Sequence, residues 1–332
     1  MSFTFRPAET GQAPIFVMIS GGTGTGKSWS AFRLARGMVG PDGRIFALDT
    51  EAGRLSTLAK FHRFDMLRME PPFRWSRIAA YAEEAEVQGA DALVIDSASM
   101  GHVGPGGHRG WVEEEVDRML AKKKRFEKDL DVEDEGEREK VRWSARRAPS
   151  LDRQEALYSF LQRRIPIIFA CRARELTEKQ GNTIKQIGWQ PVIHAELPYE
   201  MTASFLLDAT KGQGIVSHAP PCKIDADHRQ IFAEGTQVDE AMGAAFMEVM
   251  RGPREPPAFQ ALRLDGKAVP FRDFAGWRTW WDRAVKEAPA DALRKLRQAN
   301  GALMGEYAGE HGDQVMAVQA AIAAKLGETA DA

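Results

Sequence analysis

Apolar residues along the first two thirds of the chain gather in short runs. Strong runs occupy residues 15–19, 45–48, 92–95 and 167–170, and a weaker one occupies residues 64–69. A short run without polar alternation is typical of a strand buried on both faces of a sheet. The pattern therefore predicts several strands in the interior of one sheet.

Helical patterns separate these runs, at about residues 28–38, 75–88, 111–130 and 151–164. Alternation of strands and helices predicts a mostly parallel sheet with crossover helices on its faces. After residue 200 the pattern changes, because the apolar runs 204–207 and 214–217 flank Lys211-Gly212-Gln213-Gly214. This arrangement predicts an antiparallel pair at one side of the sheet. The expected fold class is α/β.

A chain of 332 residues is long enough for two domains. Residues 251–257, Arg-Gly-Pro-Arg-Glu-Pro-Pro, have the composition of a linker. Beyond them, Asp265-Gly266 predicts a small hairpin, and the rest of the chain is helical in pattern. We expect a core at 1–235 with a charged helical insertion at about 108–148, a helix and linker at 236–257, and a small mainly helical C-terminal unit at 258–332.

Two features outside the core each allow two interpretations. Residues 111–147 carry nearly equal numbers of acids and bases, with Lys122-Lys123-Lys124-Arg125 in the middle. They form either a solvated helix with i,i+4 ion pairs or an arm that touches nucleic acid. Near the C-terminus, Trp277, Trp280 and Trp281 fall near one helix face. They either pack in the core of the small unit or dock a partner.

Composition narrows the class of protein. Apolar residues make up 43% and charged residues 28%, which is the globular range, and the net charge is −2. Nucleic-acid binding would therefore need a local basic patch. Cys171 and Cys222 stand far apart, which argues against a zinc ribbon and a disulfide framework and suits a reducing compartment. No run approaches the ~20 residues of a membrane helix. We expect no membrane partner and a cytoplasmic location, in the host cytoplasm for a viral protein.

The strongest chemical signal follows the first predicted strand. Gly21-Gly22-Thr23-Gly24-Thr25-Gly26-Lys27-Ser28 matches G-x-x-x-x-G-K-[ST], the phosphate-binding loop. Glycines let backbone N–H groups curl around phosphate oxygens, and the following helix presents its positive end to the same anion. Lys27 would reach the β- and γ-phosphates, and Ser28 would supply a hydroxyl to Mg²⁺. With Trp29, these residues form the predicted ATP-binding set.

A second carboxylate site follows the strand at 92–95. Asp96 ends that strand and could hold Mg²⁺ through water. The next residue is Ser97, whereas many ATPases of this class place the water-activating glutamate there. The candidate base is instead Glu51, just past a strand that we expect to neighbour the strand of the glycine-rich loop.

These segments resemble the RecA family. Phe46-Ala-Leu-Asp-Thr-Glu51 is similar to the RecA strand that ends in its catalytic glutamate, and Val94-Ile-Asp-Ser97 is similar to its metal-binding strand. The segment 167–174 resembles the strand that ends in the γ-phosphate-sensing glutamine, but Arg172 stands where that glutamine would be. The likeness covers about residues 12–235 and extends to the short RecA-like ATPases of bacteriophages, some of which serve single-strand annealing and recombination.

The resemblance implies ATP hydrolysis, often between subunits of a homo-oligomer, coupled to single-stranded DNA. The glycine-rich segment 101–110 stands where RecA proteins carry a DNA-contacting loop. It is either such a loop or a plain mobile connection, and His102 and His108 lack the companions of a metal site. Arg172 and Arg174 either neutralise the γ-phosphate or form surface salt bridges. Lys211 and Lys223 are weaker candidates for contact with a neighbouring subunit's nucleotide.

The expected function is therefore a Mg²⁺-dependent ATPase acting in phage recombination or annealing. One alternative is a nucleotide-dependent adaptor that recruits a protein through its C-terminal unit. A less favoured alternative is a P-loop kinase in which Arg172 and Arg174 close over the phosphates.

Overall fold

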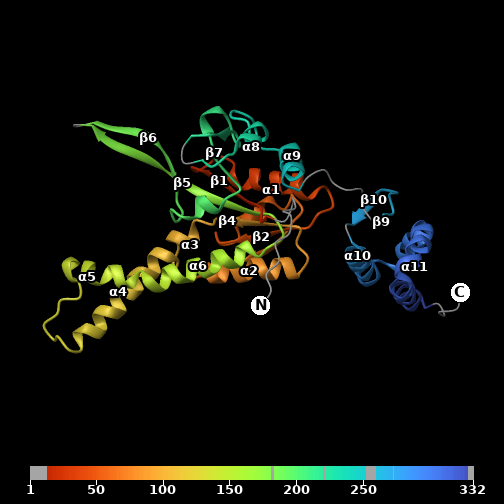
Figure 1. Cartoon of the computed structure of the whole chain (residues 1–332), viewed down its shortest axis with the longest axis horizontal. Coiled ribbons are helices and arrows are strands. Elements are labelled where there is room, and N and C mark those ends of the chain that lie inside the picture. Colours follow the sequence, from red (N-terminus) through yellow and green to blue (C-terminus); the bar gives the residue numbers. More distant parts are fainter. Residues whose placement is uncertain (1–12, 181–182, 220–221, 252–258, 272, 328–332) are drawn as a thin grey trace, which may run out of the picture. The chain divides into compact units, whose positions relative to one another are not determined.

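The computed structural model describes residues 13–180, 183–219, 222–251, 259–271 and 273–327, apart from the side chains of residues 180, 184 and 211. The chain divides into two compact units, Met1–Gly252 and Pro253–Ala332. The larger unit contains the sheet (Figure 1). The segment expected to be a linker lies almost wholly outside the described residues, and the helix before it belongs to the larger unit.

Within the described residues, eight strands form the sheet of the larger unit: β1 (Phe16–Gly21), β2 (Ile45–Asp49), β3 (Asp65–Arg68), β4 (Ala92–Asp96), β5 (Ile167–Gln180), β6 (Thr183–Pro191), β7 (Ala203–Leu207) and β8 (Val216–Ser217). Their order is β3-β2-β4-β5-β1-β7-β8, with β6 beside β5. The β5–β6 and β7–β8 pairs are antiparallel, and the other pairs are parallel. The prediction of an α/β fold with a mostly parallel sheet is confirmed, as is the late antiparallel pair.

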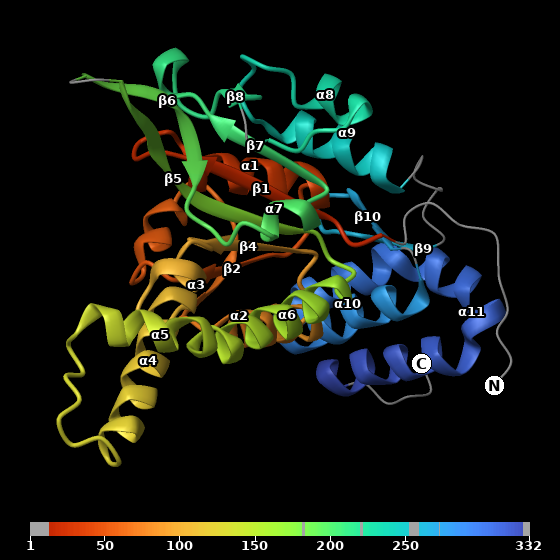
Figure 2. The same cartoon turned by 60° about the vertical axis from the view of Figure 1, so that its left-hand side comes forward.

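Two hydrophobic clusters bury the two faces of the sheet. Helices α1 (Lys27–Val39) and α9 (Glu240–Arg251) share one cluster with strand residues such as Val17 and Val94. Helices α2 (Trp75–Val87) and α6 (Arg147–Leu161) share the other with Phe16 and Ile95. Alternate residues of one strand therefore enter opposite clusters, which explains the unbroken apolar runs. Figure 2 shows the helices on both sides of the sheet.

The contact between α1 and α9 depends on two glycines. A Cβ atom on Gly37 would lie 1.9 Å from the carbonyl oxygen of Glu240, and one on Gly243 would lie 2.3 Å from that of Leu34. Backbone therefore packs on backbone at this crossing. Since α1 begins at Lys27, α9 holds the helix that follows the glycine-rich loop in place.

We expect Gly37→Ala to destabilise the larger unit by about 2 kcal/mol or more. The gain of ~1 kcal/mol in helix propensity is smaller than the cost of forcing two backbones apart. Gly110→Ala is the matched control, because a Cβ there meets its nearest atom only at 3.7 Å. It should leave stability unchanged or raise it by up to about 1 kcal/mol. Urea unfolding of both variants checks this, and equal effects would contradict the close crossing.

The charged insertion is a pair of antiparallel helices rather than one continuous helix. Helix α4 (His108–Lys124) ends before the expected residue 130, and α5 (Glu135–Ala145) returns along it. The two share a small core of Val112, Val116, Leu120 and Ala145. Ion pairs such as Arg138 to Asp117, at 2.8 Å, cover the outside. The segment is ion-paired as expected, but pairs such as this one join the two helices, whereas Lys123 to Glu127 is an i,i+4 pair of the expected kind.

Strand β5 continues ten residues beyond the predicted run and forms a two-stranded ribbon with β6. Figure 1 shows this ribbon extending away from the rest of the sheet. Trp189 of β6 lies at its base, where a Cβ atom on Gly22 would come within 3.2 Å of the indole ring. The ribbon therefore begins directly beside the glycine-rich loop.

The smaller unit consists of the hairpin β9 (Phe259–Leu262) and β10 (Ala268–Phe271), α10 (Phe274–Glu287) and α11 (Ala290–Leu326), which is kinked at His311. The predicted hairpin is confirmed, with Gly266 at φ 79° in its turn. Trp277 and Trp281 are fully buried, and Trp280 is partly buried against them. Core packing is therefore the correct interpretation of these tryptophans.

Candidate functional site

The glycine-rich loop connects the end of β1 to the start of α1. Gly24 and Gly26 have φ of 77° and 85°, which only glycine adopts without strain. A Cβ atom on Gly21 would lie 2.5 Å from Oγ1 of Thr25, whose hydroxyl donates to the Gly22 carbonyl at 3.0 Å. No side chain caps the N-terminus of α1, and its first turn has no acidic residue. The helix therefore presents N–H groups and a positive dipole end toward the loop.

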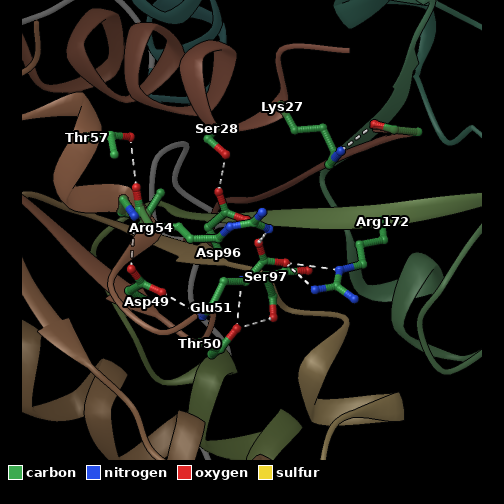
Figure 3. Close-up of polar contacts among 12 residues, drawn as sticks. Lys27, Ser28, Asp49, Thr50, Glu51, Arg54, Thr57, Asp96, Ser97 and Arg172 are labelled. Atoms are coloured by element: carbon green, nitrogen blue, oxygen red, sulfur yellow. Dashed lines mark hydrogen bonds and ion pairs between the residues drawn. The ribbon is translucent and has the colours of Figure 1, made fainter. Parts of the chain in front are cut away.

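Lys27, the first residue of α1, lies back over this loop. Its Nζ atom donates to the Gly22 carbonyl oxygen at 2.6 Å (Figure 3). Burial lowers the pKa of Lys27, while the carboxylates of Asp96 and Glu51 act in the opposite direction. Because Lys27 bonds only within the loop here, its ammonium group is suited to turn to an anionic ligand.

Asp96 ends β4 and lies buried beneath the start of α1. The hydroxyl of Ser28 donates to its carboxylate, as Figure 3 shows. Burial raises the pKa of Asp96 to about 6, against the effect of this hydrogen bond. The structure places the two residues predicted to bind Mg²⁺, Ser28 and Asp96, together, and their oxygens are the ligand type that Mg²⁺ prefers.

Glu51 and Arg172 form an ion pair across the same edge of the sheet. The Nε and Nη2 atoms of Arg172 lie 3.0 and 2.6 Å from Oε1 of Glu51, and Nη1 of Arg54 lies 3.3 Å from Oε2. Burial raises the pKa of Glu51, but the bonds and charges of Arg172 and Arg54 outweigh it and leave the pKa below its usual value. Glu51 is therefore an ionised carboxylate near Asp96 and Lys27.

The predicted neighbour of β1 was wrong. Strand β2, which leads to Glu51, pairs with β3 and β4, whereas β1 lies between β5 and β7. A single crossover through α1 carries the chain from β1 past the positions of β5 and β4 to β2. Since parallel strands place their carboxyl ends at one edge, Glu51 still reaches Arg172. The site therefore spans four adjacent strands, in the order β2-β4-β5-β1.

A cavity of about 240 Å³ lies between the start of α1 and the segment after β2. That segment includes the short 3₁₀ helix η1 (Arg54–Leu58). The cavity is lined by Ser28, Glu51, Arg54, Leu55, Thr57, Leu58 and Asp96. The predicted metal ligands and the predicted base thus border one space.

Other candidates lie away from this space. Arg174 donates to Gln190 at 3.0 Å within the ribbon, and Lys223 donates to the Tyr199 carbonyl at 2.7 Å. The side chain of Lys211 lies outside the described residues. Trp29 is partly exposed and packs edge-on against Phe61 with ring centroids 5.1 Å apart.

The segment 101–110 is not an open glycine loop. It consists of α3 (Met100–Val103), a tight connection and the start of α4. His102 is buried and stacks on His108, and both lie beside His194. Burial lowers the pKa of His102 to about 3 and that of His194 to about 4, so both rings are neutral at physiological pH. Among the residues that the structure describes, no group of three or more His, Cys, Asp or Glu side chains is placed to hold a metal ion.

Three residues that hold the backbone of this site in place were not identified from the sequence. Asp49 and Thr50 bind backbone groups around Glu51 and Asp96. Gly214 donates from its N–H to the Thr25 carbonyl at 2.8 Å and so supports the glycine-rich loop. The Asp-Thr-Glu order at the end of a predicted strand was the only available signal for the first two.

No protein-family model matches the chain, and no curated protein matches it. Within the described part of the chain, no helix is both long and apolar enough to span a bilayer.

Proposed function

We propose that this protein is a Mg²⁺-dependent ATPase with a RecA-like P-loop core. The observation that carries the proposal is the convergence at one sheet edge of an uncapped helix start with Lys27 and Ser28, a buried Asp96 and an ionised Glu51. An anion-binding loop, a metal-binding oxygen pair and a base are the parts that nucleotide hydrolysis requires.

The residues of the site fit ATP and Mg²⁺. The N–H groups of residues 22–29 would surround the phosphates, and Lys27 would leave the Gly22 carbonyl for the β- and γ-phosphate oxygens. Ser28 would bind Mg²⁺ directly and Asp96 would bind it through water. When bound, the metal would offset negative charge on the phosphates.

Hydrolysis needs a base and a positive charge near the γ-phosphate. Glu51 would accept a proton from the attacking water, because it is ionised and borders the cavity. Arg172 would release Glu51 and turn to the γ-phosphate, where its charge stabilises the transition state. The ion pair in the present structure thus places both groups within reach of one another.

The RecA resemblance extends the proposal to single-stranded DNA, in phage recombination or annealing by a homo-oligomer. Its support is that the three RecA-like segments lie on the neighbouring strands β2, β4 and β5. The adaptor alternative is weakened, because Trp277 and Trp281 are buried and do not form a docking surface. The kinase alternative is weakened, because Arg174 does not line the cavity and donates to Gln190 within the ribbon.

Steady-state ATP turnover with Mg²⁺, measured with and without single-stranded DNA, tests this function. We expect turnover that requires Mg²⁺ and rises when DNA is added. Turnover that is unchanged by DNA would support the ATPase activity and contradict the proposed role of DNA. Turnover that depends on a small phosphate acceptor would instead favour a kinase, and absence of any turnover would contradict the whole proposal.

A further inference from the structure

Thr50 connects the two carboxylates of the site through the backbone. Its hydroxyl donates to the Ser97 carbonyl at 2.9 Å and accepts from the Ser97 N–H at 2.8 Å. Its own N–H donates to the Asp96 carbonyl at 2.9 Å. Thr50 is 3% exposed and Ser97 is 1% exposed, so water does not compete for these bonds. Figure 3 shows the dashed lines that join Thr50, the residue before Glu51, to Ser97, the residue after Asp96.

These bonds stand where the sheet itself stops. Strands β2 and β4 are paired up to Asp49 and Asp96, and Thr50 and Ser97 are the next residues of each chain segment. Beyond a strand end the two backbones are free to diverge. Here the Thr50 hydroxyl bonds to the Ser97 backbone in place of a further backbone pair. The two chain segments therefore stay side by side for one more residue.

Asp49 fixes the other side of Glu51. It is fully buried, and its carboxylate accepts from the N–H groups of Glu51 at 2.6 Å and Leu55 at 3.0 Å. The backbone of Glu51 is therefore anchored to β2 by Asp49 and to β4 by Thr50. Movement of Glu51 relative to Asp96 would break several buried hydrogen bonds.

We propose that Thr50 is a positioning residue for hydrolysis, whose hydroxyl sets the Glu51 carboxylate relative to Asp96. This inference rests on the proposed ATPase function. A valine would fill nearly the same volume, so burial alone does not account for the hydroxyl. The role matters most once Arg172 has turned to the γ-phosphate. Backbone anchoring and the exposed Arg54 are then what hold Glu51 in place.

The effect should appear in the chemical step rather than in binding. The hydrogen bonds of Thr50 go to Ser97 and the Asp96 carbonyl rather than to the glycine-rich loop, whereas a displacement of ~1 Å in a reacting group costs about 10²-fold in rate. We therefore expect Thr50→Val to lower kcat by roughly 10- to 100-fold with little change in the Kd for ATP.

The experiment combines three variants with Glu51→Gln. Single-turnover hydrolysis and ATP affinity are measured for wild type, Thr50→Val, Thr50→Ser, Glu51→Gln and the double variant Thr50→Val/Glu51→Gln, with thermal melting as the check on folding. Thr50→Ser keeps the hydroxyl and should restore turnover. If Thr50 acts through Glu51, Thr50→Val should cause no further loss in the Glu51→Gln background.

A wild-type rate in Thr50→Val overturns the inference, as does an equal loss in both backgrounds. If Thr50→Val does not fold, Thr50→Ala replaces it, because alanine removes the hydroxyl without adding a methyl group beside Ser97. Absence of ATP turnover in the wild-type protein overturns the proposed function itself. If the wild-type protein hydrolyses ATP and Thr50→Val does so at the same rate, only the role of Thr50 is overturned.

Discussion

Lys27→Ala should abolish ATP hydrolysis while the fold remains intact. Lys27 provides the full positive charge that the glycine-rich loop brings to the phosphates, in a position where burial already lowers the lysine pKa. Charge held in a partly desolvated site is worth far more to a transition state than charge in water. By comparison with other cations that act on a γ-phosphate, we expect a loss of about 10³-fold or more in kcat/KM.

The fold should tolerate this change because the hydrogen bond of Lys27 Nζ is to the Gly22 carbonyl of the same loop and joins no elements of the core. The apolar face of α1 is untouched. The measurement is ATP turnover together with thermal melting and nucleotide binding. Lys128→Ala, at an exposed position of the insertion, is the matched control and should hydrolyse ATP like wild type. Wild-type turnover in Lys27→Ala would remove the assignment of residues 21–28 as a phosphate-binding loop.

The sequence was sufficient to predict the buried strands but not their order. An apolar run reports that both faces of a strand are covered, as for Val17 and Phe16 in opposite clusters. It carries no information on which strand lies alongside. Crossovers can pass over a position, and β4 and β5 therefore stand between β2 and β1. The expected neighbour of β1 was wrong for this reason.

The ribbon β5–β6 was missed because it lacks a buried face for most of its length. Residues such as Lys179 and Lys185 are exposed, so no alternation of apolar and polar residues marks the strand. The break after α4 did leave a signal. Asp134 accepts from the N–H of Glu137, and an acidic residue three positions after Asp is typical of a helix start.

Residues of the site were predictable where chemistry is encoded in neighbouring positions. The loop 21–28 and Asp96 at a strand end are local patterns, and the structure brings Ser28 and Asp96 together. The partnership of Thr50 with Ser97 joins residues 47 positions apart. Nothing in a single sequence specifies such a pair, because it depends on the order of the strands.

Glu51→Gln should bind ATP normally and hydrolyse it 10²–10⁴-fold more slowly, a loss of about the size that a positioned base contributes. Glutamine keeps the shape of glutamate and can still accept a hydrogen bond from Arg172. It cannot take a proton from water. Since Lys27, Ser28 and the loop N–H groups are unchanged, the affinity for ATP should stay close to wild type. An assembly stabilised by ATP should then persist.

Loss of the ion pair is not an adequate explanation for such an effect. Arg172 is about half exposed, and ion pairs of this kind contribute about 0–1 kcal/mol to stability. Glu70→Gln is the control, because Glu70 is an exposed glutamate paired to Arg68 at 2.7 Å, also just beyond a strand of the sheet. It should leave turnover unchanged. Single-turnover hydrolysis beside equilibrium ATP binding makes the comparison.

A wild-type rate in Glu51→Gln would mean that another group activates the water. In that event the ion pair with Arg172 would serve only to hold the segment after β2, and the likeness of that strand to the RecA family would lose its functional content. A slow variant that still binds ATP would instead identify Glu51 as the base. It would also explain why the segment is anchored on both sides, by Asp49 and by Thr50.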